Sequence, residues 1–130
     1  MRNFDFTDDR FAALIGIKLV EVKHGYAKAN LEITDKHLNA ANIVHGGVIF
    51  TLADFVFAAA SNSYGQVSLG INASILYLKP GKAKILIAEA KEISTSHKIA
   101  SYTVDIFHED REIIARFTGM VYRTKDRIKI

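Results

Sequence analysis

An aspartate lies in the middle of the most apolar segment of this 130-residue chain. Asp54 is the one ionisable residue between Val48 and Ala60, and Thr51 is the other polar one. Burying an uncompensated carboxylate costs several kcal/mol. A sequence retains such a group when it has a partner, such as Thr51 one turn earlier, or when it has a use, because perturbed acids gather at functional sites. Asp54 is therefore the first candidate for chemistry.

The second candidate lies where the apolar segment begins, at His45-Gly46-Gly47. Glycines allow another group to approach the backbone closely, and the first N–H groups of a helix have no intrahelical partner. With the helix dipole they form a site for an anion or a developing oxyanion. The alternative is structural: the glycines turn the chain into the helix, and His45 caps it or packs against it.

The two candidates cannot meet within one chain. The spacing predicts a helix over residues 46–63, which would be about 27 Å long at 1.5 Å per residue. Asp54 comes eight residues after Gly46, hence about 12 Å along the axis. An acid and an oxyanion site that cooperate must therefore come from two antiparallel helices of different subunits, which predicts an isologous dimer.

The predicted helix is apolar on nearly every face, so we expect it to be buried on every face, inside a curved sheet. Alternating or β-branched segments predict the strands of that sheet. A short helix over residues 7–14, capped by Thr7, is expected to come first. We predict one α+β domain over residues 1–130, an antiparallel sheet wrapped around one long central helix. The predicted strands are residues 17–22, 26–33, 68–78, 85–94, 99–108 and 113–123.

Composition limits the remaining classes of function. The chain has no cysteine, which excludes disulfides, thiolate metal sites and a cysteine nucleophile, and its five histidines show no helical pairing, so we expect no metal. The net charge of +3 suits an anionic ligand but is too small to indicate nucleic acid. The polar, acidic start does not resemble a signal peptide, and the apolar segment is too short to cross a bilayer. We expect a cytoplasmic protein with no membrane and no nucleic-acid partner.

The segment from Asn39 to Ser63 resembles the helix motif of hotdog-fold acyl-CoA thioesterases. Asn39, His45-Gly-Gly, Leu52-Ala-Asp54 and Asn62-Ser match in type and register, closest to the PaaI-like, phenylacetate-degradation branch. Ile75-Leu-Tyr-Leu-Lys-Pro-Gly81 resembles the strand end that follows. These motifs cover about a third of the chain.

This resemblance implies a mechanism. The Gly46 N–H would bind the thioester carbonyl, Asn39 would bind substrate or align water, and His45 would flank the carbonyl or the leaving thiolate. Asp54 of the partner would act as general base or as nucleophile, and the sequence leaves both routes open. The family forms dimers, often paired into tetramers, so we expect a homodimer or homotetramer.

Substrate contacts are less well defined by the motifs. Many relatives hold the water with a serine or threonine near the start of the strand after the helix, where this chain has Gly70. Coenzyme A is part of the substrate and carries phosphates, which suits a basic rim; no separate cofactor is expected. The candidate substrate-binding residues are Gly47, Ser68, Asn72, Ser74, Lys79 and Arg123.

Other functions remain open from the sequence. A non-catalytic hotdog protein that binds acyl-CoA is the main alternative, although a binder gains nothing from Asp54. A dehydratase or hydratase would need a histidine paired with a carboxylate. The tyrosines of the strands, Tyr77 among them, are interpreted as core and interface rather than as a stacking platform for bases.

Overall fold

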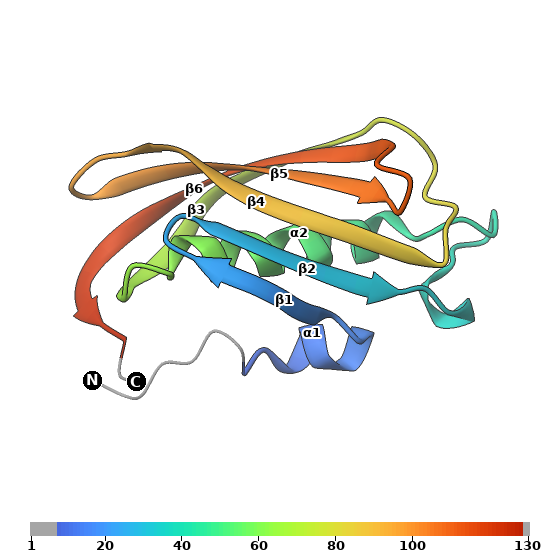
Figure 1. Ribbon diagram of the computed structural model, residues 1–130, viewed down its shortest axis with the longest axis horizontal. Helices are drawn as coiled ribbons and strands as arrows, with labels where there is room; N and C mark the ends of the chain where they lie inside the picture. Colours follow the sequence, from blue (N-terminus) through green and yellow to red (C-terminus); the bar gives the residue numbers. More distant parts are fainter. Residues whose placement is uncertain (1–7, 129–130) are drawn as a thin grey trace.

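The structure is a computed structural model that describes residues 8–128, and within that range two helices and a 3-10 turn accompany six strands (Figure 1). The order along the chain agrees with the predicted one. The bounds are α1 Arg10–Ile15, β1 Lys18–Lys23, β2 Tyr26–Glu32, the 3-10 turn η1 Asp35–His37, α2 Gly46–Ser61, β3 Gln66–Tyr77, β4 Ile85–Thr95, β5 Ile99–His108 and β6 Ile113–Arg127.

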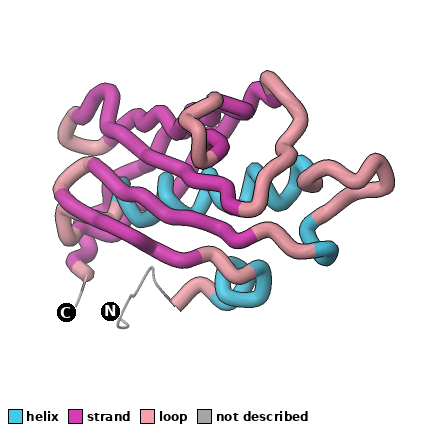
Figure 2. The backbone as a smooth tube through the Cα atoms, turned by 45° about the vertical axis from the view of Figure 1, so that its right-hand side comes forward, coloured by secondary structure: helices cyan, strands magenta, loops and turns pink. Residues whose placement is uncertain are grey.

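The six strands form one antiparallel sheet in the order β1-β2-β4-β5-β6-β3. β3 follows the long helix in sequence but pairs with β6, so it forms one edge of the sheet while β1 forms the other. Figure 2 shows the strands curving over α2, which lies along one face of the sheet. The predicted α+β architecture, a sheet around one long helix, is confirmed.

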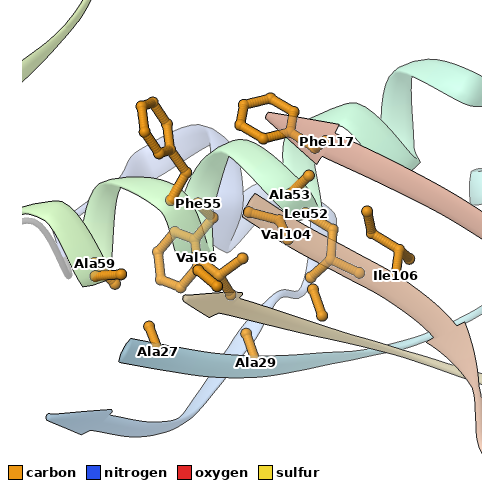
Figure 3. Close-up of a cluster of buried hydrophobic side chains, with 14 of the residues drawn as sticks. Ala27, Ala29, Leu52, Ala53, Phe55, Val56, Ala59, Val104, Ile106 and Phe117 are labelled. Atoms are coloured by element: carbon orange, nitrogen blue, oxygen red, sulfur yellow. The ribbon is translucent and has the colours of Figure 1, made fainter. Parts of the chain in front are cut away.

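Small side chains on the inner face of the sheet let the helix approach closely. Ala27 is opposite Ala90 and Ala29 is opposite Ala88, and all four are fully buried. Larger side chains of α2, among them Leu52 and Val56, pack onto this surface (Figure 3). Strand residues alternate between the two faces of a sheet, so every second residue of β2 and β4 contributes to this core.

The short helix begins later in the sequence than predicted. α1 begins at Arg10, and its N-cap is Asp9, whose carboxylate accepts the N–H of Ala12 at 3.0 Å. Thr7, the predicted cap, lies outside the described residues. Both residue types cap helices well, so the sequence did not distinguish them. α1 ends at Ile15, and its C-cap Gly16 adopts a φ of 98° that favours glycine.

The prediction that α2 is buried on every face is wrong for this chain. Gly47 and Asp54 are exposed on this helix. Thr51, which lies between them, and Ala58, one turn after Asp54, are half-buried. These residues recur at helical spacing, so they share one face of α2, which the sheet leaves uncovered. The long helix also ends two residues earlier than predicted, because Asn62 is its C-cap.

Candidate functional site

His45 caps the long helix. Its Nδ1 accepts the N–H of Gly47 at 2.8 Å, so the ring occupies the position that a serine or aspartate usually fills. A neutral imidazole that accepts through Nδ1 carries its proton on Nε2. The ring is exposed, and His45 therefore presents an N–H donor to solvent at the start of α2. The structural interpretation of His45 as a cap is confirmed. Capping uses Nδ1 and leaves the Nε2–H of the ring available to a ligand.

The N–H of Gly46 forms no hydrogen bond with any residue between 8 and 128. The N–H groups of the next residues do find acceptors, since Val48 and Ile49 both donate to the carbonyl of His45, at 2.9 and 3.2 Å. The free N–H lies at the positive end of a 16-residue helix. This is the arrangement that stabilises an anion or a carbonyl oxygen that gains negative charge.

A cleft of about 300 Å³ opens at this helix end. Its walls come from the loop before α2, the first turns of α2 and the end of β3 with the turn that follows. The lining residues are Asn39, Ile43, Val44, Gly46, Ile49, Tyr77, Leu78, Lys79, Pro80 and Gly81.

Tyr77 covers the start of the helix. Its hydroxyl donates to the carbonyl of Gly46 at 3.0 Å, and its ring would lie 3.3 Å from a Cβ atom added to Gly46. Gly46 therefore allows the aromatic ring to approach the backbone. The interpretation of Tyr77 as a residue of core or interface missed this contact, which joins two segments 31 residues apart.

Two backbone hydrogen bonds hold the loop that leads into α2. The N–H of Val44 donates to the carbonyl of Gly81 at 3.0 Å, and the N–H of His45 donates to the carbonyl of His37 at 2.8 Å. A Cβ atom on Gly81 would lie 3.0 Å from the Cβ of Val44, so glycine favours this close approach. His37 is itself fixed, because its Nε2 lies 2.7 Å from the carbonyl of Ile15 at the end of α1.

Asn39 belongs to the same cleft. Its side-chain oxygen accepts the N–H groups of Ala41 and Ile43, at 2.9 and 3.3 Å, and so shapes the loop. Within residues 8–128 the amide nitrogen of its side chain has no hydrogen-bond partner, and Asn39 lines the cleft. The predicted site residues Asn39, His45, Gly46 and Gly47 therefore lie together at one helix end.

Asp54 lies about 12 Å farther along the same helix, because the rise is 1.5 Å per residue. Thr51 does not satisfy it, since the Thr51 hydroxyl donates to the carbonyl of Gly47 at 2.7 Å. The side chain reaches solvent, contrary to the prediction of a buried carboxylate. Protein atoms around it still raise its pKa above the ordinary value of 3.8, first by desolvation and then by the negative charge of Asp9.

The remaining predicted residues do not join this cluster within one chain, apart from Lys79. Ser68 is buried near the far end of α2, where its N–H donates to Asn62 at 2.8 Å. Asn72 and Ser74 are paired with Met120 and Thr118, on the face of the sheet away from α2.

Of the two predicted cations, one lies at the cleft and one does not. Arg123 lies opposite Ser68 in the register of the sheet, and its guanidinium donates to the carbonyl of Ser96 at 3.0 Å. Lys79 lines the cleft and forms an ion pair of 2.9 Å with Glu112.

Neither a metal cluster nor a membrane helix is present among residues 8–128. No group of three or more His, Asp or Glu side chains in this range is placed to hold a metal ion. No helix in the same range is long and apolar enough to span a membrane.

The antiparallel sheet around α2, with an unpaired N–H at the helix end, is the architecture of the hotdog fold. The chain belongs to the thioesterase superfamily, whose family model matches residues 41–115. A protein of Archaeoglobus fulgidus to which esterase activity is assigned by inference is 39% identical over 127 residues, 97% of this chain and 82% of the relative.

Two further relatives place the chain more closely. The acyl-coenzyme A thioesterase PaaI of Escherichia coli is 30% identical, with 91% of this chain and 85% of that protein covered. The solved structure of E. coli PaaI has a TM-score of 0.90 and covers 95% of this chain and 91% of that one. A Streptococcus mutans protein solved with acetyl CoA bound is 26% identical, with a TM-score of 0.81 and coverage of 98% and 95%. The chain is thus a PaaI-like hotdog protein of the thioesterase and esterase type.

Proposed function

We propose that this protein is an acyl-CoA thioesterase that acts as a homodimer, with each site built from two subunits. The observation that carries the proposal is the N–H of Gly46, which lines the cleft and has no hydrogen-bond partner among residues 8–128, next in sequence to the capping ring of His45. In the proposed reaction water is added across the C–S bond of an acyl thioester, giving a free acid and the thiol of coenzyme A.

The carbonyl oxygen of the thioester would accept the N–H of Gly46. Negative charge develops on this oxygen when a nucleophile adds, and a preorganised donor at a helix N-terminus stabilises that charge more than the neutral carbonyl. His45 would donate its Nε2–H to the same oxygen or to the departing sulfur. Asn39, whose amide nitrogen has no hydrogen-bond partner in the described part of the chain, would donate to substrate or to the attacking water.

Asp54 of the partner would take the proton of the attacking water. The oxygen of that water forms the new bond to the carbonyl carbon, the tetrahedral intermediate collapses, and the C–S bond breaks with its electron pair on sulfur. The proton held by Asp54 then passes to the sulfur, which gives the thiol and restores the carboxylate. The alternative is direct attack by the carboxylate, which gives a mixed anhydride that water then hydrolyses. The raised pKa of Asp54 favours the general-base route, since a base is more effective as its pKa approaches the working pH.

The free edge of the sheet supports the dimer. β3 has twelve residues and, within residues 8–128, pairs with another strand along one side only, with β6. It exposes large apolar side chains, with Ile71 54% and Leu76 61% accessible. A long apolar edge strand invites pairing with another strand. Pairing β3 with the β3 of a second copy about a two-fold axis would join the two sheets into one continuous sheet.

The uncovered face of α2 supports the same dimer. The stripe of Gly47, Thr51, Asp54 and Ala58, exposed at Gly47 and Asp54 and half-buried at the other two, has small side chains on either side of the carboxylate. Two such helices related by a two-fold axis run antiparallel and can approach closely. This arrangement brings the Asp54 of each subunit toward the Gly46 of the other. Within one helix the two residues are about 12 Å apart and cannot act together.

The coenzyme A portion is supported by the Streptococcus mutans relative, which was solved with acetyl CoA. Lys79, at the mouth of the cleft, is the candidate for contact with its phosphates. Ser68, Asn72, Ser74 and Arg123 lie away from the cleft of their own chain, so any contact they make with substrate would occur in the site completed by the partner.

The test is release of thiol from short, medium, long and aryl acyl-CoAs, by wild type and by Asp54→Asn. The protein has no cysteine, so a thiol reagent reads only the product. We expect turnover by wild type and a loss of at least about 100-fold in the variant, the usual range for removal of a general base. Asp126→Asn, an exposed aspartate near the end of β6, is the matched control.

Two other results would contradict the proposal. Full activity of Asp54→Asn would remove the aspartate from the mechanism. Saturable binding of acyl-CoA without thiol release from any member of the panel would identify a non-catalytic acyl-CoA-binding protein instead.

A further inference from the structure

We infer that Tyr77 is a positioning residue of this site, because its hydroxyl fixes the peptide that holds the His45 ring in one tautomer. The inference rests on the proposed function for its role in turnover, but the structural relationship stands without it. It depends on two hydrogen bonds to the same peptide group, that between Gly46 and Gly47.

The peptide between the two glycines is held from both sides. Tyr77 donates its hydroxyl proton to the carbonyl oxygen of this peptide at 3.0 Å. The N–H of the same peptide, which belongs to Gly47, donates to Nδ1 of His45 at 2.8 Å. The peptide is planar and trans, so its C=O and N–H point in opposite directions within one plane. Fixing the carbonyl therefore fixes the direction of the N–H.

Glycine makes this peptide more mobile than its neighbours. Gly46 and Gly47 have no side chains to restrict their dihedral angles, and the first turn of a helix has fewer hydrogen bonds than its middle. Within α2 the carbonyl of Gly46 already accepts an intrahelical N–H, and an outside donor adds a second restraint on the plane of the peptide. Tyr77 supplies it from the end of β3, where the strand is anchored by its pairing with Ala115 on β6.

The hydrogen bonds also reinforce one another. A donor on a carbonyl polarises the peptide and makes its N–H a stronger donor. That N–H in turn keeps Nδ1 of His45 unprotonated, so the proton of the neutral ring stays on Nε2. The other tautomer would turn a lone pair toward the thioester oxygen in place of a donor. Tyr77 thus acts through His45 and does not need to contact the reacting atoms.

The test uses the full-length protein with its histidines labelled with ¹⁵N. His45→Gln identifies the His45 ring signals by their loss. In wild type at neutral to mildly alkaline pH we expect a single tautomer with the proton on Nε2. In Tyr77→Phe, which keeps the ring and removes the hydroxyl, we expect both nitrogen signals of His45 to move toward the average of two tautomers.

Tyr122→Phe is the matched control. Tyr122 is 41% exposed on β6, against 54% for Tyr77, and its hydroxyl forms no hydrogen bond within residues 8–128. We expect its His45 signals to be those of wild type. With an acyl-CoA substrate, Tyr77→Phe should lower kcat about 5- to 10-fold with KM within about 2-fold, the scale of one hydrogen bond.

Unchanged His45 ring signals in Tyr77→Phe would overturn the inference, whatever the effect on kcat. If wild type hydrolyses no acyl-CoA, the proposed function fails, but the ring signals still decide whether Tyr77 sets the tautomer. The two failures are therefore distinguishable.

Discussion

Asp9, the cap of α1, raises the pKa of Asp54 on the exposed face of α2. The short helix therefore places a second negative charge beside the acid of the candidate site. Desolvation makes the larger contribution and the charge of Asp9 adds to it. Both effects favour the protonated form of Asp54.

Asp9→Asn should lower the pKa of Asp54 while keeping α1 intact, because asparagine caps helices as well as aspartate does. If Asp54 is the base, the acid limb of the kcat/KM profile should move to lower pH, since the carboxylate would ionise earlier. The measurement is a pH–rate profile of wild type and variant.

Asp8→Asn serves as the control for Asp9→Asn, because Asp8 is exposed and does not contribute to the shift at Asp54. An acid limb that moves equally in both variants, or in neither, would contradict the coupling between the two helices.

Asp54→Asn should stabilise the fold at neutral pH. The pKa of Asp54 is higher in the folded chain than its ordinary value of 3.8, so ionisation is disfavoured by folding. The free energy of unfolding of wild type therefore falls as pH rises through the interval between the two values, and it stays low above them. Asp54→Asn has no ionisable group at this position, so its free energy of unfolding does not show this fall.

Urea unfolding at equal protein concentrations, at neutral pH and below pH 3.8, checks this prediction. The advantage of Asp54→Asn should be present at neutral pH and disappear in acid, where both states of wild type are protonated. A variant less stable than wild type at neutral pH would show that the carboxylate has a stabilising partner.

Ile71→Lys should dissociate the proposed dimer, because it places a charge on the edge strand β3. Val20→Lys is a matched control on β1, the opposite edge, since Val20 and Ile71 are 53% and 54% exposed. Light scattering should give a monomer for the first and the wild-type mass for the second, with thiol release lost only in the first. Dissociation by Val20→Lys alone would assign the interface to β1.

Gly46→Ala should lower turnover about 10- to 100-fold, the scale of a small misplacement of reacting groups. The new Cβ would lie 3.3 Å from the ring of Tyr77, so the ring, which lines the cleft, must move by a few tenths of an ångström. Alanine is a better helix former than glycine, so thermal stability should not fall. Wild-type kcat/KM in a folded variant would place the carbonyl away from this helix end.

Gly119→Ala should destabilise the core by about 1–3 kcal/mol through overpacking. Its Cβ would lie 2.7 Å from the ring of Phe57, a contact that forces the ring to move. Gly70→Ala is the control, because its Cβ would meet the other side of the same ring at an ordinary 3.4 Å. Equal urea midpoints for the two variants would show that the Phe57 ring is free to adjust.

Local patterns in the sequence were sufficient to predict the order of the helices and strands of this protein. The apolar run with His45-Gly46-Gly47 before it predicted α2 and its start, and alternation predicted the strands. The separation of Gly46 from Asp54 follows from helix geometry alone and is the reason for expecting two subunits. The grouping of Asn39 with His45 and Gly46 also rested on the sequence, since all lie within eight residues.

Only the tertiary structure decided which face of α2 stays open and what meets it. A helix apolar on every side gives no sign of where its sheet ends, so the exposure of Asp54 could not be read from periodicity. The hydrogen bond of Tyr77 to Gly46 and the electrostatic effect of Asp9 on the pKa of Asp54 join segments 31 and 45 residues apart. Such contacts depend on strand order, and the pairing of β3 with β6 rather than with a neighbour in sequence is what brings Tyr77 to the helix end.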